Sequence, residues 1–249
     1  MLTLRLKFWL IGVISGVALA CNRLLDVGRL HPARERATRA LHSTVDYIEQ
    51  HMADALGFDK PKKLLNYALS ESTVPGHYLE FGVYIGESMR YIASQKHDKP
   101  IHGFDSFRGL PGAWTGYNLQ RATFSLRSKP PRVPPNVILH IGWFSDTLPA
   151  WREKNSGPVA FVHVDCDIYS STVDLLEGLA DRLQSGTIIV FDEYFNYPNW
   201  QRHEFKAWQE FVSKYRVRYE YLAYATQQVA MRVQDVGIAT REPASHRDT

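Results

Sequence analysis

Cysteine is scarce in this chain, which has only Cys21 and Cys166 among its 249 residues. Two cysteines provide neither a disulfide framework nor a thiolate metal site. Cys166 stands between two aspartates, whose negative charge raises the pKa of a thiol and makes it a poor nucleophile. We therefore expect Cys166 to be a packing residue.

An excess of charge of either sign is also lacking. The formal net charge is +3, and prolines interrupt the basic residues around Lys129 and Arg132. Nucleic-acid-binding proteins usually carry a sustained basic stripe, so we expect no nucleic-acid partner. The composition, 45% hydrophobic and 22% charged, is that of a globular protein. The length suits one α/β domain with an extension, and we find no internal repeat.

The apolar run at residues 8–20 is short for a membrane-spanning helix, which needs about 20 apolar residues. Arg5 and Lys7 precede the run, and residues 18–20 resemble a small-residue cleavage site, a pattern typical of signal peptides. A cleaved signal and a buried helix are the alternatives to an uncleaved anchor. We expect residues 1–25 to be retained and to contact the cytoplasmic face of a membrane.

Hydrophobic periodicity predicts an alternation of helices and strands. Helices are expected over residues 33–56, from Pro61 onward, and over 86–95, 171–183 and 203–214. Strands are expected over residues 78–82, 101–104, 137–141, 159–165, 187–191, 217–224 and 227–233. This order predicts a parallel sheet with helices on both faces, and the last two strands form an antiparallel hairpin at one edge.

The same pattern divides the chain into parts. We assign residues 1–25 to the hydrophobic segment, 26–75 to a helical extension, 76–234 to the α/β domain and 235–249 to a disordered tail. Within the domain, residues 109–135 contain five prolines and three glycines and are predicted to form a long loop. Loops of this length are commonly functional.

Pairs of acids follow two strand-like runs in the middle of the chain. Asp165 and Asp167 end the first run, and Asp192 and Glu193 end the second. Ligands bind at the carboxyl ends of the strands in an open parallel sheet. Four carboxylates at one edge are costly without a cation, and oxygen ligands suit Mg²⁺ or Ca²⁺. The alternative is that these acids simply begin loops.

The first predicted strand runs into a turn that contains Gly82 and Gly86. A glycine turn between a strand and a helix lets a ligand approach the backbone. The spacing is Gly-x-x-x-Gly, so neither the dinucleotide fingerprint nor a phosphate-binding P-loop is present. A tight turn with close helix packing is the alternative.

The next two strands add residues suited to a nucleoside. Asp105 ends the second strand, where an acid can accept hydrogen bonds from ribose hydroxyls. The third strand ends at Gly142, Trp143 and Phe144, whose aromatic rings could flank an adenine. A loop-capping role for Asp105 and a core role for both rings remain open.

Five segments of the chain together resemble the macrocin O-methyltransferase family, a branch of the class I S-adenosylmethionine-dependent methyltransferases. In order, they are EFGVYIGES at residues 80–88, GFDSFRGLP at 103–111, DTLP at 146–149, VDCDIY at 164–169 and FDEY at 191–194. The resemblance covers about residues 60–233. It implies an α/β fold with a doubly wound, mostly parallel, seven-stranded Rossmann-like sheet and an N-terminal helical extension.

The resemblance also implies roles for individual residues. The S-adenosylmethionine pocket would be formed by Glu80, Gly82, Tyr84, Gly86, Ser88, Asp105, Ser106, Gly142, Trp143, Phe144 and Asp165. Mg²⁺ would be held by Asp165, Asp192 and Glu193, although the family usually has aspartate at the last position. Asp167 would be the general base, with His203 in reserve.

The resulting prediction is a Mg²⁺-dependent O-methyltransferase that acts on a hydroxyl of a sugar or polyol-bearing small molecule. We expect it in the cytoplasm, attached to the inner face of the membrane through residues 1–25, and a homo-oligomer is compatible with the sequence. The alternatives are a Rossmann-type nucleotide-sugar-modifying enzyme and a non-catalytic, membrane-anchored binding module of the same fold. The missing dinucleotide fingerprint argues against the nucleotide-sugar-modifying enzyme. The intact set of acids argues against the non-catalytic binding module.

Overall fold

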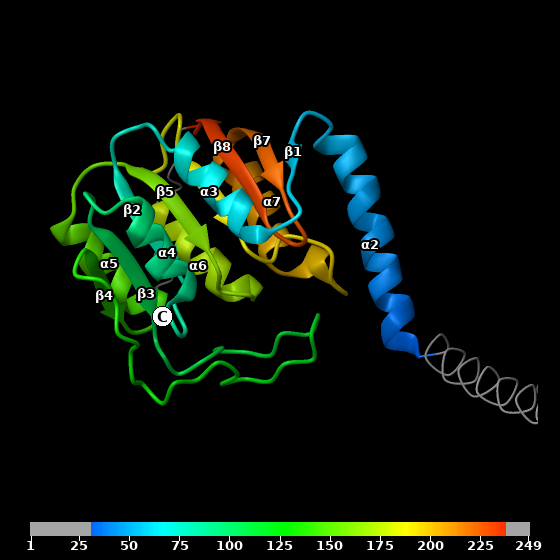
Figure 1. Cartoon of the computed structure of the whole chain (residues 1–249), viewed down its shortest axis with the longest axis horizontal. Helices are drawn as coiled ribbons and strands as arrows, with labels where there is room; N and C mark the ends of the chain where they lie inside the picture. Colours follow the sequence, from blue (N-terminus) through cyan, green and yellow to red (C-terminus); the bar gives the residue numbers. More distant parts are fainter. Residues whose placement is uncertain (1–30, 238–249) are drawn as a thin grey trace, which may run out of the picture.

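The computed structural model describes residues 31–237, and Figure 1 shows how its elements are arranged. The helical elements are α2 (Pro32–His51), α3 (Pro61–Glu71), α4 (Glu87–Gln95), α5 (Phe144–Lys154), α6 (Tyr169–Leu179), the 3-10 turn η1 (Trp200–Arg202) and α7 (Glu204–Tyr215). The strands are β1 (Leu56–Gly57), β2 (His77–Phe81), β3 (Ile101–Asp105), β4 (Val137–Ile141), β5 (Val159–Val164), β6 (Ile188–Phe191), β7 (Arg218–Tyr224) and β8 (Val229–Asp235).

The strands form one sheet in the order β1-β7-β8-β6-β5-β2-β3-β4. Only β8 runs against its neighbours β6 and β7, and the other pairs are parallel. From β2 the chain adds β3 and β4 on one side and β5 and β6 on the other. The order therefore reverses between β2 and β5, and ligands bind outside the carboxyl ends of strands at such a reversal.

The central strands are buried on both faces, as their continuous apolar sequence predicts. Every residue of β5 and of β6 is buried. One hydrophobic cluster joins the sheet to α5, α6 and α7 through side chains such as Leu148, Leu175 and Trp208. A second cluster joins the other face to α3 and α4 through side chains such as Leu64 and Met89. The predicted α/β architecture with helices on both faces is confirmed.

Helix α2 lies beside the β1–β7 edge of the sheet and stands out from the rest of the domain in Figure 1. Its inner face makes three polar contacts. The Tyr47 and Tyr221 hydroxyls lie 2.7 Å apart, Thr44 Oγ1 accepts the backbone N–H of Asn196, and Ser43 Oγ accepts the indole N–H of Trp200. The helix is therefore attached to the segment that follows β6.

Three features of the fold differ from the sequence prediction. Helix α5 was not predicted, because Pro149 lies inside it and proline usually ends a helix. Helix α2 stops at His51 rather than residue 56, and the two residues Leu56 and Gly57 form the short β1 instead. The sheet consequently has eight strands rather than seven.

Some predictions fall on parts of the chain outside residues 31–237. The hydrophobic segment at residues 1–25 is one of them, and most of the tail is another, although Asp235 still belongs to β8. Between residues 31 and 237, no helix is long and apolar enough to cross a membrane. The division of the chain into an extension and a domain stays a prediction, and α3 covers one face of the sheet together with α4.

Candidate active site

The turn after β2 makes the closest backbone approach in the site. Gly82 has φ +92°, and a Cβ atom at this position would lie 1.6 Å from the carbonyl oxygen of Asp165. Only glycine leaves room for that approach. Gly86, at φ +78°, then caps the start of α4. The glycine turn therefore brings the ends of β2 and β5 together at the point where the strand order reverses.

Asp105 ties two loops together at the end of β3. Its Oδ2 atom accepts the backbone N–H groups of Val83 at 2.9 Å and Tyr84 at 2.8 Å, and its Oδ1 atom accepts that of Phe107 at 2.7 Å. A carboxylate offers about four lone-pair positions, so one acceptor position is left after these three bonds. Asp105 is therefore both a structural residue and an available acceptor.

A cavity of about 640 Å³ opens at these loops. Nine of the predicted site residues line it: Gly82, Tyr84, Asp105, Ser106, Trp143, Phe144, Asp165, Asp167 and Glu193. Six predicted site residues are not in its lining: Glu80, Gly86, Ser88, Gly142, Asp192 and His203. The structure therefore places the glycine turn, the Asp105 loop and the acidic edge around one space.

Three carboxylates converge at the acidic edge. Ligand oxygens of Asp165, Asp167 and Glu193 all lie within 4.8 Å of one another. Burial, followed by the charge of Asp192, raises the pKa of Asp167 to about 7 and the pKa values of Asp165 and Glu193 well above their usual range. Glu193 Oε2 is buried and has no hydrogen-bond partner within residues 31–237. These oxygens fit a divalent cation. A bound cation would offset the repulsion among the carboxylates and would supply a partner for Glu193 Oε2.

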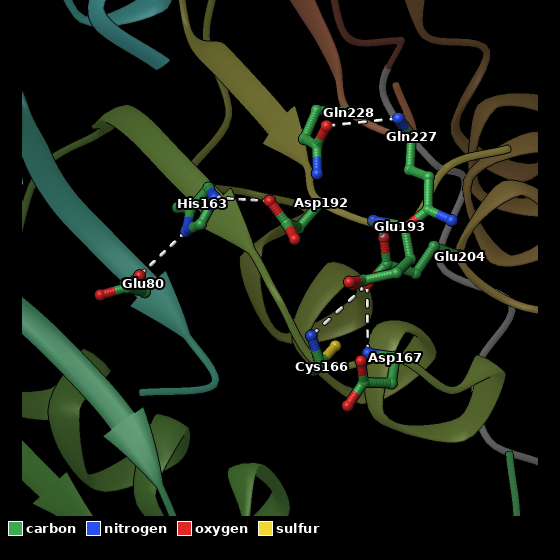
Figure 2. Close-up of polar contacts among 9 residues, drawn as sticks. All are labelled: Glu80, His163, Cys166, Asp167, Asp192, Glu193, Glu204, Gln227 and Gln228. Carbon is green, nitrogen blue, oxygen red and sulfur yellow. Dashed lines mark hydrogen bonds and ion pairs between the residues drawn. The ribbon is translucent and has the colours of Figure 1, made fainter. Parts of the chain in front are cut away.

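Asp192 is turned toward a histidine rather than toward this group, as Figure 2 shows. Its Oδ1 atom lies 3.8 Å from Nε2 of His163, whose Nδ1 atom lies 2.9 Å from Glu80 Oε1. Burial opposes a charge on His163, but the contacts with Asp192 and Glu80 outweigh it and raise the pKa of the imidazole well above its usual value. Despite burial, His163 also lowers the pKa of Asp192. The buried His163 side chain therefore lies between the carboxyl groups of Glu80 and Asp192.

His163 was missed by the sequence analysis, although the sequence contains a signal. It is a lone basic residue in the buried apolar strand β5, and Glu80 occupies the matching register position on the neighbouring strand β2. Buried charged groups are normally paired, so a Glu and a His on buried strands suggest a pair once the strand order is known. Glu80 Oε2 is also buried, and in the described part of the chain it has no hydrogen-bond partner.

Glu204 stands at the start of α7. Its side chain is completely buried and its carboxylate accepts backbone N–H groups from the loops that follow β5 and β6. Burial and the charge of Asp167 raise its pKa to about 8, while the backbone N–H groups act in the opposite direction. This residue lies behind the converging carboxylates rather than in the cavity lining.

His203 occupies a different position from the one expected of a base. Its Nε2 atom lies 3.2 Å from Thr115 Oγ1, its Nδ1 atom is buried without a partner, and it is not in the cavity lining. Burial and Arg202 lower its pKa. Cys166 is buried, and burial raises the pKa of its thiol, which agrees with the expected packing role.

The long loop after β3 covers part of the cavity. Phe124 packs against the ring of Tyr84 with centroids 5.4 Å apart, and Trp114 and Arg121 from the same loop line the cavity. Arg121 is the one cationic side chain in a lining that otherwise contains several acids. The loop therefore supplies aromatic surface and a positive charge to the lining of the same cavity.

The solved structures of two methyltransferases align with this chain. A calicheamicin methyltransferase aligns with a TM-score of 0.56 and 20% identity over 80% of this chain and 91% of its own. The O-methyltransferase NovP aligns with a TM-score of 0.54 and 23% identity over 70% of this chain and 80% of its own. The fold is that of a class I methyltransferase. A family model described as a methyltransferase domain matches residues 79–194. This range contains the glycine turn and all four acids of the acidic edge.

Two curated proteins are similar in sequence to parts of this chain. The Streptomyces olivaceus 8-demethyl-8-(2,3-dimethoxy-alpha-L-rhamnosyl)-tetracenomycin-C 4'-O-methyltransferase is 37% identical over 78 residues, which are 31% of this chain and 25% of that protein. The Streptomyces niveus demethyldecarbamoylnovobiocin O-methyltransferase is 28% identical over 171 residues, 60% of this chain and 61% of that protein. The chain thus spans about a quarter of the length of the first relative and about three fifths of the length of the second. The narrower macrocin assignment stays a prediction.

Proposed function

We propose that this protein transfers a methyl group from S-adenosylmethionine to a hydroxyl of a sugar-bearing small molecule. The observation that carries the proposal is the shared cavity, which places the glycine turn and Asp105 beside Asp165, Asp167 and Glu193. Methyl transfer needs a sulfonium and an oxygen held in line, and one cavity with a nucleoside end and an acidic end can hold both. Both curated relatives are named O-methyltransferases of glycosylated or antibiotic compounds.

The cofactor would occupy the end of the cavity formed by Gly82, Asp105, Trp143 and Phe144. Asp105 keeps one free acceptor position, which suits a ribose hydroxyl. Glu80 is buried outside the cavity lining and pairs with His163, so its contact with the cofactor stays a prediction of the sequence analysis. Gly82 lets the turn pass close to β5 and leaves the cavity open above it.

A divalent cation would be held at the other end. Asp165 and Glu193 are the ligands on which the sequence prediction and the observed convergence agree. The sequence prediction adds Asp192 as the third ligand, whereas the geometry groups Asp167 with them. When bound, Mg²⁺ would lower the pKa of an acceptor hydroxyl and orient it. Metal titration of Asp192→Ala and Asp167→Ala distinguishes the two sets, because only loss of a true ligand abolishes binding.

Asp167 is our proposed general base for the acceptor hydroxyl. Its carboxylate lines the cavity, and an ionised carboxylate can accept the proton of a hydroxyl that binds there. His203 lies outside the cavity lining and bonds to Thr115, so it is the weaker choice. Because S-adenosylmethionine is a cytoplasmic cosubstrate, we place the reaction in the cytoplasm, and we retain membrane contact through residues 1–25 as a prediction.

The proposal is tested with the full chain. Calorimetry should show binding of S-adenosylhomocysteine but not of a nicotinamide dinucleotide. Labelled S-adenosylmethionine is then incubated with a panel of O-glycosides, with Mg²⁺ and with EDTA. Transfer of label to a glycoside with Mg²⁺, and its loss with EDTA, is the expected result. Failure to bind S-adenosylhomocysteine would remove the methyltransferase proposal, and full transfer in EDTA would remove the metal.

A further inference from the structure

One buried carboxylate joins the two loops that carry the acidic edge. Glu204 Oε1 accepts the backbone N–H of Asp167 at 3.2 Å and of Cys166 at 3.4 Å, and Oε2 accepts the backbone N–H of Glu193 at 3.1 Å. Figure 2 shows Glu204 facing both loops. The Glu204 side chain belongs to α7, so a third element connects the ends of β5 and β6.

These three N–H groups lie where the sheet hydrogen bonds end. The N–H of Asp165 still bonds to Phe81 and that of Asp192 to Val164, but the following N–H groups have no acceptor in the sheet. Within residues 31–237, Glu204 is the acceptor for Cys166, Asp167 and Glu193. A buried N–H without an acceptor is unfavourable, so Glu204 determines which loop conformation is stable.

The conformation of Asp167 increases this dependence. Asp167 has φ +67°, in the left-handed region that non-glycine residues adopt only when surrounding contacts hold them there. Its N–H bond to Glu204 is such a contact, and the same glutamate fixes the backbone of Glu193. Two of the three side chains that converge in the cavity, Asp167 and Glu193, therefore depend on a single residue that does not enter the cavity lining.

We propose that Glu204 is a positioning residue that sets the spacing of the Asp167 and Glu193 carboxylates, and hence the affinity of the acidic edge for a divalent cation. This inference rests on the proposed metal-dependent function. Glutamate is required because its two carboxylate oxygens accept three N–H groups. Glutamine has one acceptor oxygen, and its NH₂ group would face an N–H group of one of the loops.

The test compares Glu204→Gln with Glu210→Gln, a matched control on the same helix. Glu210 is half exposed, and among residues 31–237 its carboxylate bonds only to Lys206 and Tyr169. Mn²⁺ alone is titrated into each protein, and amide hydrogen exchange is followed at residues 166, 167 and 193. We expect Glu204→Gln to bind Mn²⁺ about tenfold or more weakly, as for other partners that orient metal ligands. Exchange at the same amides should be about tenfold faster. S-adenosylhomocysteine affinity should be unchanged, and the control should match the wild type in all three measurements.

The outcomes are separable. Wild-type Mn²⁺ affinity in Glu204→Gln, or unchanged exchange at all three amides, would overturn the positioning role. If Glu204→Gln does not fold, Glu204→Asp replaces it, since the charge is kept but the shorter side chain cannot reach both loops. Wild-type Mn²⁺ affinity in that variant would also overturn the inference. If the wild type itself binds no Mn²⁺, the proposed metal dependence fails, while the exchange measurement still decides whether Glu204 holds the loops.

Discussion

At the scale of single residues, the site uses carboxylates in two distinct ways. Asp105 and Glu204 accept backbone N–H groups and so shape loops, whereas Asp165, Asp167 and Glu193 converge without donors. Backbone bonds favour the ionised form of a carboxylate, and mutual repulsion opposes it. The first kind therefore fixes the conformation of the loops, and the second kind destabilises the empty site until a cation or proton is bound.

Asp105→Ala should weaken S-adenosylhomocysteine binding by about tenfold or more, because hydrogen bonds to a charged group contribute about 1.5–3 kcal/mol. The variant also frees the N–H groups of Val83, Tyr84 and Phe107, so part of the loss reflects loop disorder. Calorimetry measures the change. Asp98→Ala is the control, since Asp98 is exposed and pairs with the exposed Lys99. Equal affinities in the two variants would exclude Asp105 from the cofactor site.

Asp167→Asn should lower kcat by about 10²–10⁴-fold, the usual contribution of a general base, because an amide cannot accept the proton. S-adenosylhomocysteine binding should persist, since Asp105 and the glycine turn are unchanged. Turnover with a glycoside acceptor found in the screen above gives the rate. Normal turnover would mean that another group, such as His203, accepts the proton.

At the scale of elements, sequence periodicity predicted the strands well and side-chain pairing poorly. The limits of β4 were predicted correctly, and those of β2, β3, β5 and β6 lie within about one residue of the prediction. Glu204 could not be connected to Asp167 from the sequence, because 37 positions separate them and α7 reaches the loop only after the sheet forms. The orientation of Asp192 likewise depends on His163, which lies on a neighbouring strand.

The junction of β2 and β5 gives a prediction with a matched control. Gly82→Ala and Gly157→Ala place a methyl group at nearly the same backbone angle, φ +92° and +95°. A Cβ at Gly82 would collide with Asp165, whereas none of the surrounding atoms lies within 4 Å of a Cβ at Gly157. We expect Gly157→Ala to cost about 1–2 kcal/mol of backbone strain. Gly82→Ala should cost more and abolish S-adenosylhomocysteine binding.

Urea unfolding and calorimetry measure these two effects. Equal stability losses, with cofactor binding intact in Gly82→Ala, would show that β2 and β5 can separate without harm to the cavity.

At the scale of the whole molecule, the acidic edge links stability to pH and to metal. Asp167 has a pKa of about 7 in the folded protein, against about 4 in an unfolded chain. Between these values the folded state binds more protons, so the free energy of unfolding falls as pH rises. The raised pKa values of Asp165, Glu193, Glu204 and His163 act in the same direction. The lowered pKa values of His102, His140 and His203 act in the opposite direction up to about pH 6.5, and the lowered pKa of Asp192 acts only below about pH 4.

In EDTA, Tm should therefore be higher near pH 5.5 than near pH 8, with about 2–4 °C for each kcal/mol of difference. Saturating Mg²⁺ should raise Tm at pH 8 and reduce the pH dependence, because it binds the ionised carboxylates of the folded state. Scanning calorimetry at both pH values measures this. A Tm in EDTA that stays constant or rises over this range would show that other groups of the protein already neutralise the charge of the acidic edge.

The attachment of α2 has a practical consequence for anyone who shortens this protein. Removing the chain up to residue 55 looks harmless, since most of α2 is exposed. It would, however, take away Thr44 and Ser43, the acceptors for Asn196 and Trp200, and those partners begin only three positions after Glu193. A trimmed version made for crystallisation could fold and still lose affinity at the acidic edge, and its low activity would then be wrongly assigned to the choice of acceptor.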